Sequence, residues 1–366
     1  MKIIINQPRA SYFVGGAEMI SFDHAINLYN LGHDIYFFTI LPSSVNLKHS
    51  PQFEKFYQKY FDKIHIIEIS QDKKVEDIYE IEPGQDRCRW NIESIYYNQK
   101  LYEYIFEHQE KYDAIFSYYN LDAVFIPRKY ISKNVLYLCG IPREQNDFQG
   151  SFLSAYDSVI AISEEVKESW KRYCKNEVKV ISTGVDCNRF SPQNKYSSTK
   201  TINLLYVGRL IERKNIDKII QSYEKLQSIY NVKLIIVGDG PDRKRLKTMS
   251  NKCVFTGNVQ DTEHYYQQAD IFISPSGYGE GLQGTILEAM SCGLTIVATN
   301  TQINSELLAD GRGFVVESNV DSIVEGIKRA IDSDRTKISQ KNREYVIKHY
   351  NWKNKVNEIL EELKWI

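Results

Sequence analysis

The amino-acid sequence predicts an α/β protein made of two doubly wound domains. Short β-branched or aromatic runs alternate with helical patterns along the chain. The polar segment 190–200 interrupts this alternation, contains Pro192 and lacks periodicity, as interdomain linkers do. The alternation then restarts, and each half has a glycine-containing turn after its first strand. Such a pattern is typical of parallel sheets with helices on both faces.

The strand candidates are short and separated by helical patterns or loops. In the first half they are 2–6, 33–40, 63–69, 112–118, 134–140, 157–163 and 177–183, with an amphipathic helix around 17–31. In the second half they are 202–208, 232–240, 252–257, 269–276, 294–299 and 313–317. Ligands of doubly wound sheets bind beyond the carboxyl ends of the strands. Two facing domains would therefore hold one ligand in the cleft between them.

Length and composition narrow the class of protein. A chain of 366 residues is too long for one ordinary core and suits two domains. The net charge of −1 gives no basic field for nucleic acid. The six cysteines are scattered without a CxxC pair, which argues against a zinc site or disulfide framework. Neither a signal peptide nor an apolar run of membrane-spanning length is apparent. A cytoplasmic location is expected.

The segment 51–63 carries an aromatic stripe at helical spacing, with lysines opposite it. One interpretation is a membrane-interface surface, which would place the protein at the inner face of the membrane. The other is a stripe packed on the core of the first domain, and we favour it because aromatic stripes are usually core. The residues of the stripe are Phe53, Phe56, Tyr57, Tyr60 and Phe61.

Two glycine-containing turns are candidate phosphate sites. In "YVGRLIERKN" (206–215), a buried strand ends at Gly208, and Arg209 and Lys214 follow it. Two cations beside a helix N-terminus suit an anion such as a diphosphate, although solvated surface cations would give the same pattern. In "YFVGGAE" (12–18), Gly15 and Gly16 would let the backbone approach a ligand, and a plain tight turn is equally compatible.

The third candidate is "GYGEGLQGTILEAMSCG" (277–293), a glycine-rich loop with two carboxylates. Its helix is expected to start near Gly284 or Thr285, which puts Glu288 in the first turn or just beyond. A carboxylate there is favoured by the helix dipole, so Glu288 alone has a structural explanation. Glu280 has no partner nearby in sequence, and an acid in a loop of bare backbone suits the binding of ligand hydroxyls.

Taken together, these motifs resemble those of glycosyltransferases with the GT-B fold, specifically the large retaining family 4 (group 1). The resemblance is strongest over residues 178–316. It is carried by "VKVISTGVDCNRFSP", "LLYVGRLIERKNIDKII", "LIIVGDGP", "VFTGNV" and "SPSGYGEGLQGTILEAMSCGLTIVAT", the last containing an E-x7-E element as Glu280 and Glu288. The first half matches mainly through "GGAE". The resemblance implies two Rossmann-like domains, an acceptor-side domain at 1–185 and a nucleotide-sugar-binding domain at 200–349. A C-terminal helix at about 350–366 would pack back on the first domain.

The resemblance also implies roles for individual residues. Arg209 and Lys214 would hold the donor diphosphate and stabilise charge on the leaving nucleotide, and Glu280 would contact the donor sugar. These three are the catalytic residues that the resemblance implies. Glu288 would hold the ribose hydroxyls. Fixed cations can neutralise that charge without a metal, so neither metal nor cofactor is expected. The remaining donor-binding positions are Gly15 and Gly16 from the first domain, Gly208, backbone around Asn258 and Val259 beside the base, Gly281 and Leu282.

The sequence departs from the family at one place. Many members carry a histidine at the end of a first-domain strand, facing the donor sugar, whereas the window 136–144 has Cys139 and Gly140 instead. Tyr118, Arg143 and Glu144 are the candidates to replace it, or activity is altered.

The function expected from the sequence is transfer of a hexose or N-acetylhexosamine from a UDP- or GDP-sugar to an acceptor hydroxyl. The acceptor would be a glycan, glycolipid or glycoprotein of the cell surface. An alternative is a catalytically weak glycosyltransferase-like subunit that binds and stabilises an active partner enzyme. A sugar-nucleotide epimerase or a phosphorylase on the same fold is a further alternative, which the E-x7-E spacing and the paired cations disfavour.

Overall fold

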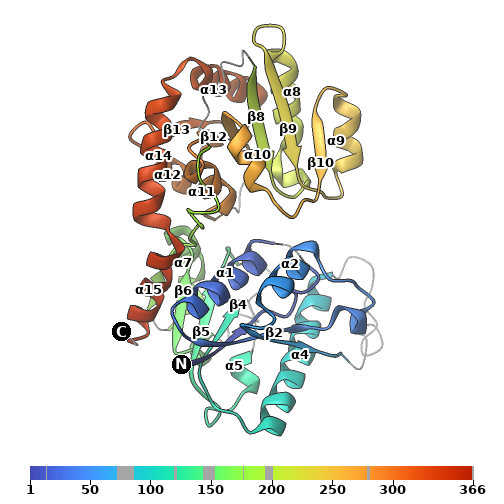
Figure 1. Cartoon of the computed structure of the whole chain (residues 1–366), viewed down its shortest axis with the longest axis vertical. Helices are drawn as coiled ribbons and strands as arrows, with labels where there is room; N and C mark the ends of the chain where they lie inside the picture. Colours follow the sequence, from blue (N-terminus) through green and yellow to red (C-terminus); the bar gives the residue numbers. More distant parts are fainter. Residues whose placement is uncertain are drawn as a thin grey trace. The chain divides into compact units, whose positions relative to one another are not determined.

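A computed structural model describes residues 1–13, 15–71, 86–118, 122–142, 153–175, 177–193, 201–277 and 281–364 of the chain (Figure 1). For residues 86–91, 123 and 124 it describes the backbone only. Contacts divide the chain into two units, Met1–Ser182 with Val356–Ile366, and Thr183–Lys355. The chain therefore returns to the first unit at its C-terminal end.

The first unit contains a parallel sheet. Among the described residues its strands are β1 (Lys2–Asn6), β2 (Asp34–Ile40), β3 (His65–Ile69), β4 (Tyr112–Tyr118), β5 (Ile131–Leu138), β6 (Ser158–Ala161) and β7 (Val178–Val180). They are ordered β3-β2-β1-β4-β5-β6-β7, and neighbours pair in parallel. The order reverses between β1 and β4, which is the switch point of a doubly wound sheet.

Helices connect these strands, as parallel pairing requires. They are α1 (Gly16–Asn30), α2 (Pro51–Tyr60), α4 (Asp86–His108), α5 (Asp122–Phe125) and α7 (Glu164–Trp170), with short 3₁₀ turns at Pro42–Val45, Leu153–Ala155 and Lys171–Tyr173. The end of α15 (Trp352–Glu362) completes this unit, and it buries Val356, Ile359 and Leu360.

The aromatic stripe of α2 is divided between core and surface. Phe56 stacks on Phe22 of α1 at 4.7 Å between ring centroids, and Phe53 is also buried. Tyr57 and Phe61 are 41% and 62% exposed. The core interpretation is therefore confirmed for the two buried phenylalanines, while the other end of the stripe lies at the surface. No helix in the part of the chain that the structure describes is long and apolar enough to span a membrane.

The second unit contains another parallel sheet. Its described strands are β8 (Ile202–Val207), β9 (Val232–Val237), β10 (Val254–Gly257), β11 (Ile271–Ser274), β12 (Thr295–Thr299) and β13 (Gly313–Val316), ordered β10-β9-β8-β11-β12-β13. Its helices are α8 (Ile216–Leu226), α9 (Arg243–Met249), α10 (Glu263–Gln268), α11 (Gly284–Ser291), α12 (Gln302–Leu307), α13 (Val320–Asp332) and α14 (Arg335–Tyr350), with a 3₁₀ turn at Glu212–Lys214. The switch point lies between β8 and β11.

Alternating strand residues of this sheet enter two cores, because successive side chains of a strand point to opposite faces. Leu204 and Tyr206 pack in the core formed with α8 and α13. Leu205 packs in the other core, which includes residues of α10, α11 and α14. Both faces of the sheet are thus covered by helices, as its continuous apolar strands require.

The boundary between the units lies before the predicted linker at 190–200. Phe190 is buried in the core of the second unit, and its carbonyl accepts hydrogen bonds from Ser291 Oγ (2.5 Å) and Arg343 Nη1 (2.8 Å). Val185 N donates to Tyr350 O at 2.7 Å. These contacts tie the start of the predicted linker to the second unit, and residues 194–200 lie outside the described residues.

Candidate functional site

The site begins at the switch point of the second sheet. The loop 208–215 follows β8, and the loop that starts at Pro275 follows β11, the strand beside β8. Both loops leave from the carboxyl edge of the sheet, since the strands are parallel. This is where doubly wound sheets bind ligands.

Two hydrogen bonds join these loops directly. Gly277 N donates to Arg213 O at 3.0 Å, and Asn215 Nδ2 donates to Pro275 O at 3.0 Å. Asn215 has a left-handed backbone (φ 50°), which turns the chain from the 3₁₀ turn into α8. The loop that carries Arg209 and Lys214 is therefore fastened to the loop that leads into α11. The Arg209 side chain is exposed and the Lys214 side chain is half-buried.

Close backbone packing fixes the start of the loop 208–215, called the cation loop here because it carries Arg209 and Lys214. Gly208 N donates to Val237 O at 3.0 Å, and Leu210 N donates to Asp239 O at 2.9 Å. Gly238 has a positive φ of 133°, and a Cβ placed on it would lie only 2.0 Å from Gly208 O. The backbone that follows β8 therefore crosses the backbone that follows β9 so closely that only glycine fits at position 238. This crossing positions Arg209.

Two serines at the carboxyl edge of the sheet form hydrogen bonds with the end of the glycine-rich loop. Gln283 Oε1 accepts hydrogen bonds from Ser274 Oγ (2.9 Å) and Ser276 Oγ (3.4 Å), immediately before α11 begins. The predicted helix start at Gly284 is confirmed. Leu282 is buried and packs into the core of the second unit. Gly281 is half-buried. The predicted catalytic residue Glu280 lies outside the described residues.

Glu288 lies in the middle of α11, just beyond its first turn, and its side chain is half-buried. The Tyr266 hydroxyl of α10 donates to Glu288 Oε2 at 2.6 Å. Burial raises the pKa of Glu288 from 4.5 to about 7, although the Tyr266 hydrogen bond and the positive charge of Arg189 lower it. Glu263 raises it further. The carboxylate is therefore close to its protonation point at neutral pH.

Val259 follows β10 and is partly buried against the core that contains α10 and α11. Its strand is an edge strand of the described sheet and lies two strands away from β8, which precedes the loop of Arg209 and Lys214. The structure thus places Gly208, Arg209, Lys214, Gly281, Leu282 and Glu288 around one switch point and Val259 further along the same edge.

Gly15 and Gly16 lie in the first unit, at the start of α1. Gly15 is the N-cap of this helix, and a Cβ placed on it would lie 2.6 Å from Glu18 Oε2. The buried carboxylate of Glu18 folds back over Gly15 and lies at the positive end of the helix dipole. An anion of the protein itself therefore already lies beside this turn.

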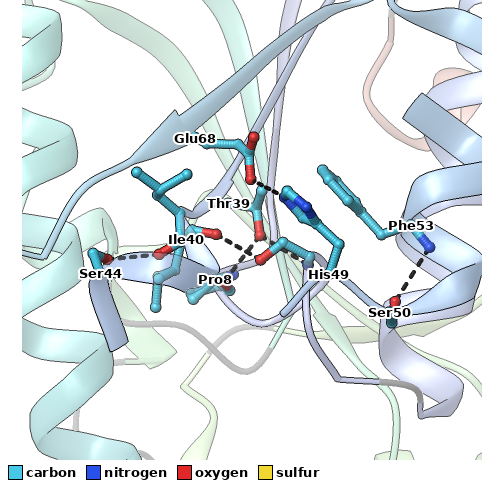
Figure 2. Close-up of polar contacts among 10 residues, drawn as sticks. Pro8, Thr39, Ile40, Ser44, His49, Ser50, Phe53 and Glu68 are labelled. Carbon is cyan, nitrogen blue, oxygen red and sulfur yellow. Dashed lines mark hydrogen bonds and ion pairs between the residues drawn. The ribbon is translucent and has the colours of Figure 1, made fainter. Parts of the chain in front are cut away.

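The loop before α1 is fastened to the end of β2 (Figure 2). Thr39 Oγ1 donates to Pro8 O at 3.0 Å, and Ser11 Oγ donates to Ile40 O at 2.5 Å. Beside them, His49 Nε2 lies 2.6 Å from Glu68 Oε1, and the Ser50 hydroxyl caps α2 by accepting from Phe53 N (3.2 Å). The bonds of Pro8 and Ser11 fix the loop that precedes α1 to the end of β2.

Of the candidates to replace the missing histidine, Tyr118 alone is described. It is 2% exposed, and its hydroxyl lies 2.6 Å from Nδ1 of His24 on α1. Burial lowers the pKa of His24 to about 3, so the imidazole is neutral. The Tyr118 hydroxyl is thus engaged inside the first unit. Arg143 and Glu144 lie outside the described residues.

Among the described residues, Tyr266, Arg189 and Glu263 act on Glu288 and were not predicted from the sequence. Arg189 Nη2 and Nε donate to Glu263 Oε2 at 2.8 and 3.1 Å. An aromatic residue on a short helix is typical of core, and no local motif links positions 189, 263 and 288. Within the described residues, no group of three or more His, Cys, Asp or Glu side chains could hold a metal ion.

Comparison with solved structures identifies the fold class. A glycosyltransferase from Rickettsia africae superposes with a TM-score of 0.74 at 21% identity, covering 99% of this chain and 97% of that one. Anabaena HepE, solved in complex with UDP-glucose, superposes with a TM-score of 0.76 at 18% identity, covering 100% of both chains. At these identities the likeness shows the fold alone, and that fold is GT-B.

Comparison with protein families is more specific. Residues 189–349 match the family described as glycosyl transferases group 1. An uncharacterized glycosyltransferase of Methanocaldococcus jannaschii is 32% identical over 222 residues, 55% of this chain and 57% of the relative. The lipopolysaccharide 1,2-N-acetylglucosaminetransferase of Salmonella typhimurium is 28% identical over 181 residues, 44% of this chain and 48% of the relative.

The chain spans about half to three-fifths of the length of the curated relatives it matches. Over residues 189–349 the chain is similar to the group 1 glycosyltransferases. Its assignment to the retaining family 4 stays a prediction.

Proposed function

We propose that the chain is a retaining, metal-independent glycosyltransferase that moves a hexose or N-acetylhexosamine from a UDP- or GDP-sugar to an acceptor hydroxyl. The observation that carries the proposal is the pair of hydrogen-bonded loops at the switch point of the second unit. They bring Arg209 and Lys214 to the same sheet edge as the loop that leads to Glu288. A group 1 glycosyltransferase domain over these residues supports the same reading.

The proposed chemistry uses the two cations where negative charge develops. The bond between the anomeric carbon of the sugar and the oxygen of the β-phosphate breaks, and the acceptor oxygen forms the new bond to that carbon. The nucleoside diphosphate leaves with the bonding electrons, and its departing oxygen takes up the proton that the acceptor hydroxyl loses. Arg209 and Lys214 stabilise that leaving group, because fixed charges act most strongly where charge appears in the transition state. Glu280 would hold the sugar and Glu288 the ribose.

Support for the substrate classes comes from the relatives. Anabaena HepE was solved with UDP and with UDP-glucose, and relatives are named for lipopolysaccharide, teichuronic acid and capsular polysaccharide synthesis. A UDP-linked donor and a glycan or glycolipid acceptor are therefore the first substrates to test. Peripheral contact with the inner face of a membrane is part of the same proposal, since a glycolipid acceptor would require it.

The test measures consumption of UDP- and GDP-sugars with glycan and glycolipid acceptors, and the anomeric configuration of the product by NMR. We expect retention of configuration, and large losses of rate in Glu280→Gln and Glu288→Gln. Lys233→Ala is the matched control, because Lys233 is an exposed cation near the amino end of β9, away from the carboxyl edge. Transfer at the wild-type rate by both glutamine variants would contradict the proposal.

A second candidate function is a catalytically weak subunit that binds and stabilises an active glycosyltransferase. It is motivated by the window 136–142, which contains no histidine, and by the engagement of the Tyr118 hydroxyl with His24. This candidate predicts nucleotide binding without turnover. Turnover that appears only when a partner glycosyltransferase is added, and that survives Glu280→Gln, would favour it.

A further inference from the structure

Glu288 of α11 accepts a hydrogen bond from Tyr266, a residue of the neighbouring helix α10. Tyr266 is fully buried, and its ring packs edge-on against Phe190 (5.6 Å between centroids) and beside Phe272 (5.8 Å). A ring enclosed in this way has one position, so its hydroxyl has a fixed direction. That direction points at Glu288 Oε2, 2.6 Å away.

The direction of this hydrogen bond is fixed by the chemistry of the tyrosine. Burial raises the pKa of Tyr266 well above its usual value, and the nearby carboxylate adds to the effect. The phenol therefore keeps its proton and donates it to Glu288. A distance of 2.6 Å is typical of a hydroxyl that donates to an ionised carboxylate. Glu288 Oε2 is engaged by this bond, so Oε1 is the oxygen that a ligand hydroxyl would meet.

The charge of Glu288 depends on the same surroundings. Burial favours its protonated form, whereas the Tyr266 hydroxyl and the charge of Arg189 favour the carboxylate. Arg189 is held in place by Glu263, a residue of α10 like Tyr266, and its guanidinium lies over the Phe190 ring at 4.9 Å. A protonated Glu288 would have one acceptor oxygen fewer for the two hydroxyls of a ribose.

We propose that Tyr266 is a positioning residue that aims Glu288 at the ribose and keeps it an acceptor, so that discrimination between ribo- and deoxyribonucleotides depends on a hydroxyl that does not touch the ligand. The inference rests on the proposed function and deepens it. A site built to bind a ligand hydroxyl rejects the analogue without it, because the polar group of the site is then left unpaired.

The experiment is titration calorimetry of UDP and 2′-deoxy-UDP, and of GDP and 2′-deoxy-GDP, against the full chain and its Tyr266→Phe variant. The variant keeps the ring and removes the hydroxyl. We expect the wild type to prefer the ribonucleotide, and Tyr266→Phe to lower that preference by about tenfold with little change for the deoxynucleotide. Tyr265→Phe is the matched control, since it makes the same change one residue earlier on α10 and should leave the preference unchanged.

A double-mutant cycle separates positioning from general loosening of the fold. In a Glu288→Gln background, Tyr266→Phe should have no further effect on the preference, because both changes act on one interaction. An additive effect would overturn the inference. So would a preference in Tyr266→Phe equal to that of the wild type.

The pH profile of the wild type tests the inference even if Tyr266→Phe folds poorly. The ratio of UDP to 2′-deoxy-UDP affinity cancels titration of the diphosphate, which the two ligands share. The ratio should fall as pH drops below about 7, since Glu288 then gains a proton. The titratable and charged groups that act on Glu288 are the neutral Tyr266 hydroxyl, Glu263 and Arg189. A ratio independent of pH would overturn the inference.

Failure of the inference differs from failure of the proposed function. If no nucleoside diphosphate binds the wild type, both are overturned. If UDP or GDP binds with a ribose preference that Tyr266→Phe and pH leave unchanged, the proposed function stands and the role of Tyr266 is wrong.

Discussion

At the scale of single residues, two glutamates near helix starts differ in what surrounds their carboxylates. Glu18 lies at the N-terminus of α1, where the helix dipole and close packing over Gly15 explain it. Glu288 lies beyond the first turn of α11, and it depends on Tyr266 for a hydrogen bond. The first is accounted for by structure alone, while the second lies beside the candidate site with its pKa raised to about 7.

The raised pKa of Glu288 predicts how the second unit responds to pH. Between the ordinary pKa of 4.5 and about 7, the folded chain binds a proton that the unfolded chain has lost. The free energy of unfolding should therefore fall as pH rises through this window, by roughly 1–3 kcal/mol. Glu288→Gln should remove this fall. Urea unfolding at both ends of the window measures it, and an unchanged slope in the variant would refute the assignment.

At the scale of elements, the crossing of the β8 and β9 loops decides where Arg209 lies. Gly238→Ala would bring its Cβ to 2.0 Å from Gly208 O at a φ of 133°, so the crossing must open. We expect a loss of stability of about 2–4 kcal/mol, together with weaker nucleotide binding. Gly284→Ala is the control for stability, since a Cβ there meets nothing within 4 Å and helix starts accept alanine. Equal stability of the two variants would show that the crossing is not tight.

The aromatic stripe of α2 gives a second prediction at this scale. Phe56→Ala removes a buried ring that stacks on Phe22, and it should cost about 3–5 kcal/mol of stability. Phe61→Ala removes a ring that is 62% exposed, and it should leave thermal stability nearly unchanged. Comparable losses in the two variants would contradict the division of the stripe between core and surface.

The strands and their order along the chain were predictable from the sequence, because short β-branched and aromatic runs mark buried parallel strands. Each predicted segment overlaps an observed strand, with ends that differ by a few residues. Strand β5 starts at Ile131, before the predicted 134, since Ile131 and Lys133 pair with β4 through backbone bonds that no side-chain pattern reveals. The neighbours of each strand, and hence the switch points, come from long-range pairing.

The candidate site was predictable only in part, for a similar reason. Arg209 and Lys214 lie in a recognisable loop after one strand, and Glu288 lies in the helix after another, so their approximate places could be inferred. The Tyr266 hydroxyl bonds to Glu288, and the charge of Arg189 acts on it, from segments far apart in the chain. A buried tyrosine on a short helix has no local signal of such a role.

At the scale of the whole molecule, the chain builds two units and closes the first one with its last residues. Val356–Ile366 belongs to the first unit, where Leu360 and Leu363 are buried. Leu360→Ala should destabilise the first unit by about 2–5 kcal/mol. It should leave nucleotide affinity unchanged, because the proposed nucleotide-binding residues of the switch point lie in the second unit. Loss of nucleotide binding in a folded Leu360→Ala protein would contradict this separation.

The central claim is that the second unit binds a nucleoside diphosphate through the cations of its switch point. The most direct measurement is a thermal-shift panel of UDP, GDP, ADP and CMP, with and without EDTA, on the wild type, Arg209→Ala and Lys233→Ala. A ligand that binds only the folded chain raises its melting temperature. We predict that UDP or GDP raises it, that EDTA does not abolish the rise, and that Arg209→Ala loses it while Lys233→Ala keeps it. A wild type that no nucleotide stabilises, or an Arg209→Ala variant that responds like the wild type, would contradict the claim.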